Sequence, residues 1–224
     1  MDIYDIALSK IQQKLAKTSV LPKDEGELSA DAVKKIESLA ERFGIAKDEV
    51  ISAVLTNLVA YRVIVGKNPS KMDYYEDTLK AYLETLDEVK SVKKLPKSGK
   101  NSLHVRGGKI VSNLKKDKNL KSLDLQVEFK NGQVAYVIHK YTRDTGGTQG
   151  SASRDAIMTL KQGLDANGTR ILNLVAVLDG PYYQLKNKHG ETKLSIAKKE
   201  DPDALICTYL EFQETTKPIW ESQE

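Results

Sequence analysis

Apolar residues recur three and four positions apart over roughly the first 90 residues, the spacing that places them on one face of an α-helix. The second stripe is the best delimited, because Ser29 precedes it as an N-cap residue and Gly44 follows it as a C-cap residue. The four stripes span residues 3–15, 33–43, 50–59 and 72–89. They predict four helices that form a helical N-terminal lobe.

The apolar pattern has β character further along the chain, in short segments bounded by turn residues. The expected strands are residues 103–111, 123–129, 134–141, 171–178 and 204–212. Asn131-Gly132 joins the second and third of them as a hairpin signal. The nearly all-apolar segment 171–178 predicts a strand buried on both faces, and therefore internal and parallel to a neighbour.

A loop rich in Gly, Ser and Thr, residues 145–151, leads into an expected helix over residues 152–162. The order of hairpin, helix, buried strand and further strands predicts a mixed α/β layer. We therefore expect an α/β fold of the α+β kind, with a helical lobe over residues 1–95 and a mixed β-sheet with a flanking helix over residues 96–224. A single continuous domain is the alternative.

Composition supports a folded protein rather than a disordered chain, because hydrophobic residues make up 40% and charged residues 29% of the sequence. The only cysteine, Cys207, lies in an apolar string and is expected to be a small buried core residue. The start of the chain is acidic and lacks an apolar leader, and no run approaches the roughly 18 apolar residues of a membrane span. We expect a cytoplasmic protein without a membrane partner.

Positive charge is concentrated between Lys90 and Lys121, where eleven basic residues face one acid, Asp117. Such a block attracts a phosphate backbone and releases its counterions. Arg106 and Lys109 are the candidate DNA contacts in this stretch. The alternative is a solvated basic linker.

The segment 122–144 carries the residues best suited to chemistry. Asp124 lies on the first arm of the expected hairpin and Lys140 at the end of the second. Hydrolysis of a phosphodiester needs a divalent cation, and Mg²⁺ prefers carboxylate oxygens. A nearby lysine orients the attacking water or stabilises developing negative charge, so Asp124 and Lys140 are candidates for these two roles.

An acid on the first hairpin strand, a lysine on the second, a helix and then a buried apolar strand resemble the PD-(D/E)xK nuclease superfamily, which includes most type II restriction endonucleases. The resemblance covers residues 103–180 and implies a restriction-endonuclease-like core. It also implies Mg²⁺-dependent hydrolysis of double-stranded DNA at a short specific site. Two positions depart from the pattern: Leu123 replaces the proline before Asp124, and Ile138 replaces the acid two positions before Lys140.

A subgroup of restriction enzymes supplies the missing carboxylate from the following helix. The run from Lys140 through Arg143, Asp144 and Gln149 to Ser153-Arg154-Asp155 is similar to that arrangement. The resemblance makes Asp155 a metal ligand together with Asp124. An acid in the first turn of a helix is also favoured by the helix dipole, so Asp155 has a purely structural explanation as well.

Two hairpin registers are open. A two-residue turn at Asn131-Gly132 pairs Asp124 with His139 and places Lys140 on the opposite face. A three-residue loop with a glycine bulge brings Asp124, Ile138 and Lys140 onto one face. The catalytic interpretation requires the second register, or a bulge nearby.

The polar loop after Lys140 supplies candidate base-reading side chains. Arginine suits guanine edges, glutamine suits adenine, and aspartate accepts from cytosine. The candidates for DNA binding here are Arg143, Asp144, Gln149 and Arg154, and the alternative is a surface loop whose glycines serve turns. The loop lacks the lysine of a phosphate-binding loop, so no nucleotide cofactor is expected.

Two residues are held in reserve for the site. Glu128 is the reserve carboxylate, although its position next to the turn is also typical of a strand residue that faces solvent. His139 could line the site beside Lys140, or be an ordinary histidine of the hairpin surface. The three histidines are widely separated and show no zinc-ligand spacing.

The leading hypothesis is a type II restriction endonuclease in which Asp124 and Asp155 bind Mg²⁺ and Lys140 assists the attacking water. Cleavage of two antiparallel strands at a symmetric site favours a homodimer with twofold symmetry. One alternative is a non-catalytic nucleic-acid-binding protein with a degenerate nuclease fold. Another is a helical interaction protein without a nucleic-acid partner.

Overall fold

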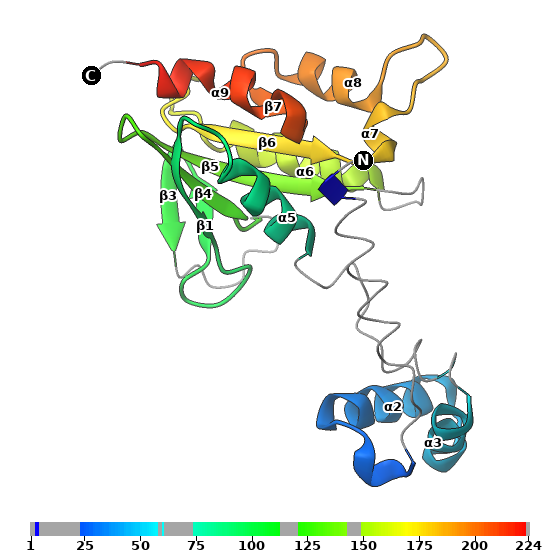
Figure 1. Cartoon of the computed structure of the whole chain (residues 1–224). Coiled ribbons are helices and arrows are strands. Elements are labelled where there is room, and N and C mark those ends of the chain that lie inside the picture. Colours follow the sequence, from blue (N-terminus) through cyan, green and yellow to red (C-terminus); the bar gives the residue numbers. More distant parts are fainter. Residues whose placement is uncertain are drawn as a thin grey trace. The chain divides into compact units, whose positions relative to one another are not determined.

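The chain folds into two compact units, Met1–Tyr74 and Tyr75–Glu224 (Figure 1). The structure, a computed structural model, describes residues 3–4, 23–57, 60, 74–112, 121–142 and 149–222. The second compact unit begins at Tyr75, about twenty residues before the boundary expected between residues 95 and 96.

The first unit contains the short 3-10 helix η1 (Glu25–Glu27) and the helices α2 (Ala30–Phe43) and α3 (Lys47–Thr56). The caps predicted for α2 are confirmed. The Ser29 hydroxyl accepts a hydrogen bond from the Ala32 amide at 3.2 Å, and Gly44 ends the helix with a φ of 64°. The helices share a core made of Ile36, Ala40, Val50, Ile51 and Val54. The stripe over residues 3–15 lies, apart from residues 3–4, outside the described residues.

The second unit is built on a mixed sheet of five strands in the order β1-β4-β5-β6-β7. β1, β4 and β5 are antiparallel, whereas β6 is parallel to β5 and β7 is parallel to β6. The strands are β1 (Val89–Lys94), β4 (Leu125–Phe129), β5 (Val134–Tyr141), β6 (Leu174–Asp179) and β7 (Leu205–Cys207). The expected α+β fold is confirmed. So is an internal parallel strand, although it begins at Leu174 and not at Ile171, which is exposed; all six residues of β6 are buried.

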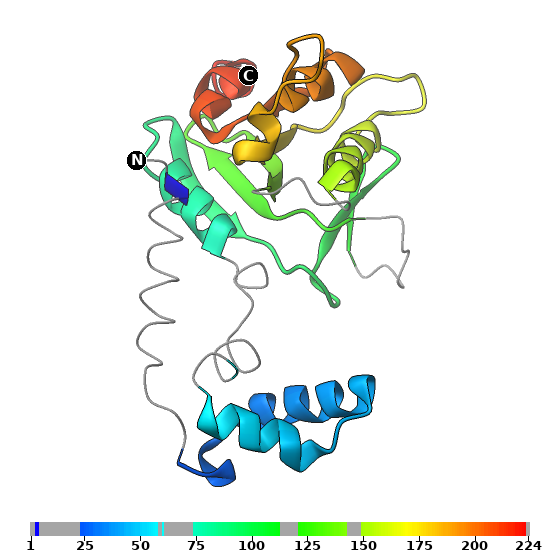
Figure 2. The same ribbon diagram turned by 90° about the vertical axis from the view of Figure 1, so that its right-hand side faces the viewer.

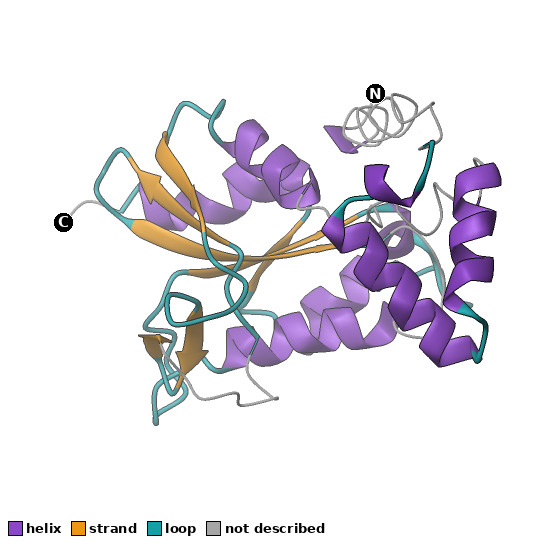
Figure 3. Ribbon diagram, turned by 90° about the horizontal axis from the view of Figure 1, so that it is seen from below, coloured by secondary structure: helices purple, strands orange, loops and turns teal. Residues whose placement is uncertain are grey.

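Helices cover both faces of this sheet (Figure 3). α5 (Tyr74–Leu83) and α9 (Phe212–Trp220) pack on one face, together with alternate apolar residues of the strands. α6 (Gln149–Lys161), α7 (Pro181–Gln184) and α8 (Lys193–Glu200) pack on the other. Figure 2 shows α5 and α6 on opposite sides of the strands. Within the described ranges, no helix has the length and apolar character needed to cross a membrane.

Three expected elements differ from the structure. The segment 103–111 is a hairpin of two strands, β2 (Leu103–Arg106) and β3 (Lys109–Ser112), because Gly107 and Gly108 both adopt positive φ and form a turn. The segment 204–212 contains only the short β7, followed by the 3-10 helix η3 (Tyr209–Glu211) and the start of α9.

The end of the fourth helical stripe is in fact β1. A bulge between Val89 and Ser91 shifts the register of β1 against β4, so the buried residues Val89, Val92 and Leu95 lie three positions apart. Three-residue spacing is typical of a helix, whereas a regular strand has a period of two. This bulge explains why the segment was predicted as the end of a helix.

The hairpin between β4 and β5 adopts the second of the two expected registers. Leu125 pairs with Val137 and Glu128 with Val134, while the Phe129 amide donates to the Gln133 carbonyl at 2.9 Å. The loop therefore holds three residues, and Gly132 occupies the bulge position with a φ of 87°. This register places Asp124 opposite Ile138.

Gly132→Ala is expected to lower the free energy of unfolding by about 1 kcal/mol, because an L-residue is strained at this φ. A Cβ at this position meets no atom within 4 Å, so the backbone alone accounts for the effect. Urea unfolding measures it. The neighbouring Lys130→Ala should change stability by less than about 0.5 kcal/mol, and equal losses in the two variants would contradict a specific role for glycine.

Cys207 is fully buried in the sheet, as expected, and burial strongly raises the pKa of its thiol. The thiolate is the reactive form of cysteine. We therefore expect no reaction with a thiol reagent such as DTNB in the native protein over an hour, and complete reaction of this single thiol in guanidinium chloride. Release of thionitrobenzoate measures the reaction, and labelling of the native protein within minutes would contradict the expectation.

Candidate functional site

Asp124 is fixed by three strands just before β4 begins. Its amide donates to the Val137 carbonyl and its carbonyl accepts from the Leu95 amide, both at 2.9 Å. Its carboxylate oxygen Oδ2 accepts from the His139 amide at 2.8 Å. The side chain is only 7% exposed, so both the backbone and the carboxylate are held in one position.

Lys140 reaches this carboxylate from β5. Its Nζ lies 3.8 Å from Asp124 Oδ2, and its side chain is 26% exposed. Because side chains alternate along a strand, Lys140 shares a face with Ile138, which packs in the same cluster as Ala156 and Ile157 of α6. The sequence candidates Asp124 and Lys140 therefore meet on the face of the sheet that α6 covers.

Asp155 lies on α6 and is paired with a lysine that the sequence interpretation did not assign to it. Lys121 Nζ lies 3.2 Å from Asp155 Oδ2, and the two side chains are 47% and 33% exposed. Lys121 precedes Asp124 by three residues, so the same chain segment contacts α6 through Lys121 and provides the buried carboxylate of Asp124. Two acid–lysine pairs thus connect β4, β5 and α6.

The donor set is suited to Mg²⁺ in part. Mg²⁺ usually keeps several waters and takes one or two protein carboxylates. Oδ1 of Asp124 makes no hydrogen bond to another described residue and is available as a ligand, while Asp155 offers a partly exposed carboxylate. However, no group of three or more acidic, histidine or cysteine side chains with metal-binding geometry occurs among the residues that the structure describes.

His139 does not join Lys140, because adjacent strand residues point to opposite faces. Its ring lies on the other face, where Nε2 is 3.6 Å from Asp179 Oδ2; both side chains are almost completely buried. Asp179 Oδ1 also accepts from the Tyr209 amide at 3.0 Å. The interpretation of His139 as a reserve site residue is wrong for its side chain, although its amide holds Asp124.

Glu128 is also separated from the site. It lies four residues along β4 from Asp124, a distance of about 13 Å at the usual rise of a strand. Lys90 of β1 binds its carboxylate at 2.6 Å and Ser91 at 3.0 Å. These hydrogen bonds, from Lys90 and then Ser91, hold the pKa of Glu128 below its usual range. The reserve carboxylate is thus a surface ion-pair residue.

The predicted basic stretch is partly neutralised within the fold. Four of its lysines form ion pairs with acids of the second unit: Lys90 with Glu128, Lys94 with Asp77, Lys97 with Glu76, and Lys121 with Asp155. Residues 113–120, which contain three more of its lysines, lie outside the described residues. The stretch is therefore neither a linker nor a uniformly free positive surface, because β1, β2 and β3 run through it.

Arg106 and Lys109 face each other across the β2–β3 hairpin and are exposed. The Gly108 amide between them donates to the Gln162 carbonyl at 2.8 Å, which attaches this turn to the end of α6. Gln162 follows Asp155 by seven residues, about 10 Å along a helix. Arg106 and Lys109 therefore lie near the C-terminal end of α6, beyond the position of Asp155 on that helix.

Among the expected base-reading residues, Arg154 is exposed on α6, next to Asp155. Arg143 and Asp144 lie outside the described residues, and so does the side chain of Gln149. Asp179 was not singled out from the sequence. The signal available for it was its position at the carboxyl end of the buried strand, where polar residues of parallel sheets gather.

Comparison with known proteins adds no assignment. No protein-family model matches the chain, and no curated protein sequence matches it significantly. The site must be interpreted from its own residues.

Proposed function

We propose that this protein is a Mg²⁺-dependent endonuclease of the type II restriction kind, which hydrolyses double-stranded DNA at a short specific site. The proposal depends on one observation: Lys140 Nζ lies 3.8 Å from the buried Asp124 carboxylate, although the two residues come from different strands. Folding holds these two charges in place before a substrate binds. Such preorganised charge is the main source of the rate enhancement in many enzymes.

The order of elements around the pair supports this proposal. The β4–β5 hairpin is followed by α6 and by β6, which is parallel to β5. This is the order on which the resemblance to PD-(D/E)xK nucleases was based. Asp124 and Lys140 occupy the two hairpin positions that the resemblance assigns to the acid and the lysine.

In this proposal each residue has a separate role. Asp124, with Asp155 as its partner on α6, would hold a divalent cation, which would supply positive charge for the phosphate and activate water. The His139 amide keeps the Asp124 carboxylate in one orientation. Lys140 stabilises the negative charge that develops on the phosphate oxygens. Arg154, Arg106 and Lys109 contact the DNA backbone or bases, as do Arg143, Asp144 and Gln149.

A twofold dimer in the cytoplasm is part of the proposal, since two active sites are needed to cut both strands of a symmetric site. Sedimentation velocity of the free protein and of its complex with a duplex tests the oligomeric state.

A second candidate is a non-catalytic nucleic-acid-binding protein. It is favoured by Ile138, which is fully buried where the nuclease pattern has an acid, and by the engagement of Asp155 with Lys121. Both candidates predict DNA binding that weakens steeply with salt. Only the nuclease cuts DNA.

Incubation of the purified full chain with a sequenced plasmid and Mg²⁺ tests the proposal. Discrete fragments are expected with Mg²⁺ and none with EDTA. An intact plasmid, under conditions in which the protein binds the same DNA, would favour the non-catalytic candidate. Absence of both cleavage and salt-dependent binding would leave only the interaction protein considered from the sequence.

A further inference from the structure

A small polar pocket lies between α6, α7 and α8, on the helical layer that contains Asp155. Its volume is about 180 Å³, and its lining residues come from all three helices. The side chains that matter here are Arg154 of α6, Tyr182 of α7, and Lys193 and Glu200 of α8. Arg154 follows the loop after β5 and immediately precedes Asp155, so the pocket is close in sequence to the proposed nuclease site.

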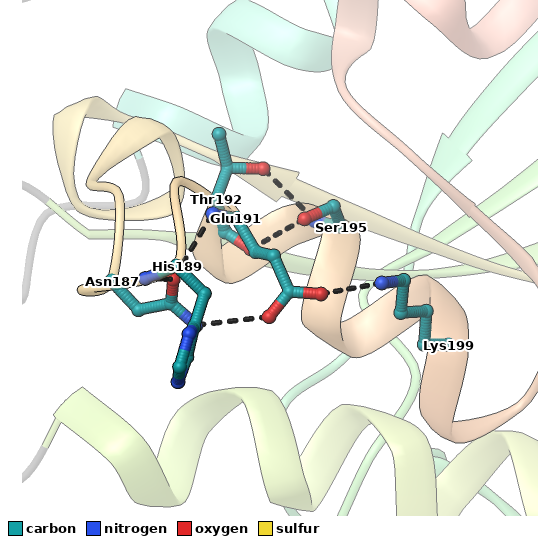
Figure 4. A network of polar contacts seen from close by, with 6 residues as sticks. All are labelled: Asn187, His189, Glu191, Thr192, Ser195 and Lys199. Carbon is teal, nitrogen blue, oxygen red and sulfur yellow. Dashed lines mark hydrogen bonds and ion pairs between the residues drawn. The ribbon is translucent and has the colours of Figure 1, made fainter.

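The two cations of this pocket have no ion-pair partner in the part of the chain that the structure describes. Neither Arg154 nor Lys193 forms an ion pair with any residue that the structure describes, Glu200 included. The acid nearest to Lys193 in sequence, Glu191, is bound instead by Lys199 and by the Asn187 amide group (Figure 4). Lys199 and then Asn187 lower the pKa of Glu191, which is therefore committed to that network.

Lys193 also conflicts with its local structure. It is the first residue of α8, directly after the N-cap Thr192, whose hydroxyl accepts from the Ser195 amide at 3.0 Å. The helix dipole favours acids at this position and disfavours a lysine, yet the first turn of α8 contains no acid. A lysine at a helix N-terminus is unfavourable unless another group contacts its charge. Such departures from local preference are expected at functional sites, where a ligand can supply the contact.

We propose that this pocket is a phosphate-binding subsite, in which Arg154 and Lys193 grip one phosphate group from two sides. Arg154, Lys193 and Glu200 together give the pocket a net charge of about plus one, which is enough to attract an anion. The favoured ligand is a phosphodiester of bound DNA. The choice of DNA as the nucleic acid rests on the proposed function. A free phosphate monoester has the same chemistry and is the other possible source.

Duplex binding by fluorescence anisotropy, measured between 50 and 200 mM KCl in EDTA, tests the subsite. Each phosphate contact contributes about 0.9 to the slope of log K against log salt. Lys193→Gln is therefore expected to lower the slope by about 0.9 and to weaken binding about eightfold near 0.1 M salt. Arg154→Gln should lower the slope similarly. Lys188→Gln, an exposed lysine of the loop before α8, is the matched control and should leave both values unchanged.

A second arm distinguishes the two sources of phosphate. Inorganic phosphate at millimolar concentrations is titrated against the wild type and Lys193→Gln, and thermal unfolding is followed. Stabilisation of the wild type alone, with no change of duplex slope in the variant, would assign the pocket to a free phosphate or nucleotide. Loss of duplex slope in the variant assigns it to DNA.

The proposal is overturned if Lys193→Gln matches the wild type in both arms, or if Lys188→Gln lowers the duplex slope as much as Lys193→Gln. Thermal unfolding without ligand confirms that each variant is folded. The binding assay needs no Mg²⁺, so an uncut plasmid together with a lowered slope would reject the nuclease and keep the subsite. Plasmid cleavage, together with an unchanged slope and no selective stabilisation of the wild type by phosphate, would keep the nuclease and reject the subsite.

Discussion

Replacement of Lys140 by alanine is expected to lower the rate of Mg²⁺-dependent plasmid cleavage by about two to three orders of magnitude, while duplex binding remains within about tenfold of the wild type. Lys140 is the cation next to the buried Asp124 carboxylate, at 3.8 Å. Its removal takes away charge that is placed to stabilise the transition state more than the bound substrate. Single-turnover cleavage of a labelled plasmid measures the effect.

The matched control is Lys130→Ala, because Lys130 is an exposed lysine in the turn of the same hairpin. It should cleave at the wild-type rate. Asp124→Asn should lose activity at least as fully as Lys140→Ala, since the amide keeps the shape but has no negative charge for the cation. Full activity in Lys140→Ala and Asp124→Asn would remove both residues from the proposed site, even if the protein cuts DNA.

Replacement of Asp179 by alanine is expected to lower the free energy of unfolding by about 3 kcal/mol. A buried ring and a partly buried amide each lose a contact with the Asp179 carboxylate. The ring of His139, at 3.6 Å, loses the carboxylate beside it, and the Tyr209 amide loses its acceptor at 3.0 Å. Disruption of a buried hydrogen-bond or ion-pair network is among the few causes of large mutational effects. Urea unfolding followed by circular dichroism gives the value.

Asp203→Ala is the control for this experiment, because Asp203 is an exposed acid two residues before β7. It should change stability by less than about 0.5 kcal/mol. If Asp179→Ala were as stable as Asp203→Ala, the buried contact between β6 and η3 would contribute nothing, and Asp179 would be a better candidate for a functional acid than for a structural one.

Much of the fold could be predicted because the local rules agree in several segments. The strand at residues 134–141 has the predicted limits, since its apolar residues are bounded by Asn131-Gly132 on one side and a polar loop on the other. The second helix was predicted with both caps, because Ser29 and Gly44 fulfil their preferred roles. Such segments need no tertiary information.

The errors occurred where tertiary contacts override the local pattern. The bulge in β1 gave Val89, Val92 and Leu95 a helical spacing, and only pairing with β4 reveals a strand there. Similarly, the apolar run after residue 204 is long enough for a strand, yet it leaves the sheet after Cys207 and becomes helical so that Phe212 and Ile219 pack on the face covered by α5.

The candidate site was predictable in part for the same reason. Residue types alone indicated Asp124 and Lys140, but two turn lengths were compatible with Asn131-Gly132, and only one of them brings the pair together. The pairing of Lys121 with Asp155 was not predictable, because it joins segments more than thirty residues apart. The unpaired Lys193 could be noticed only after its neighbours were known to be engaged elsewhere.

The ends of β5 and β6 are joined tightly by Thr142 and Gly180. The Thr142 amide donates to the Asp179 carbonyl at 2.8 Å, and a Cβ at Gly180 would lie 2.3 Å from the Thr142 carbonyl oxygen. Thr142 is therefore held at a point that the sheet fixes, immediately after the end of β5. A side chain at position 180 would therefore have to push the end of β5 away from β6.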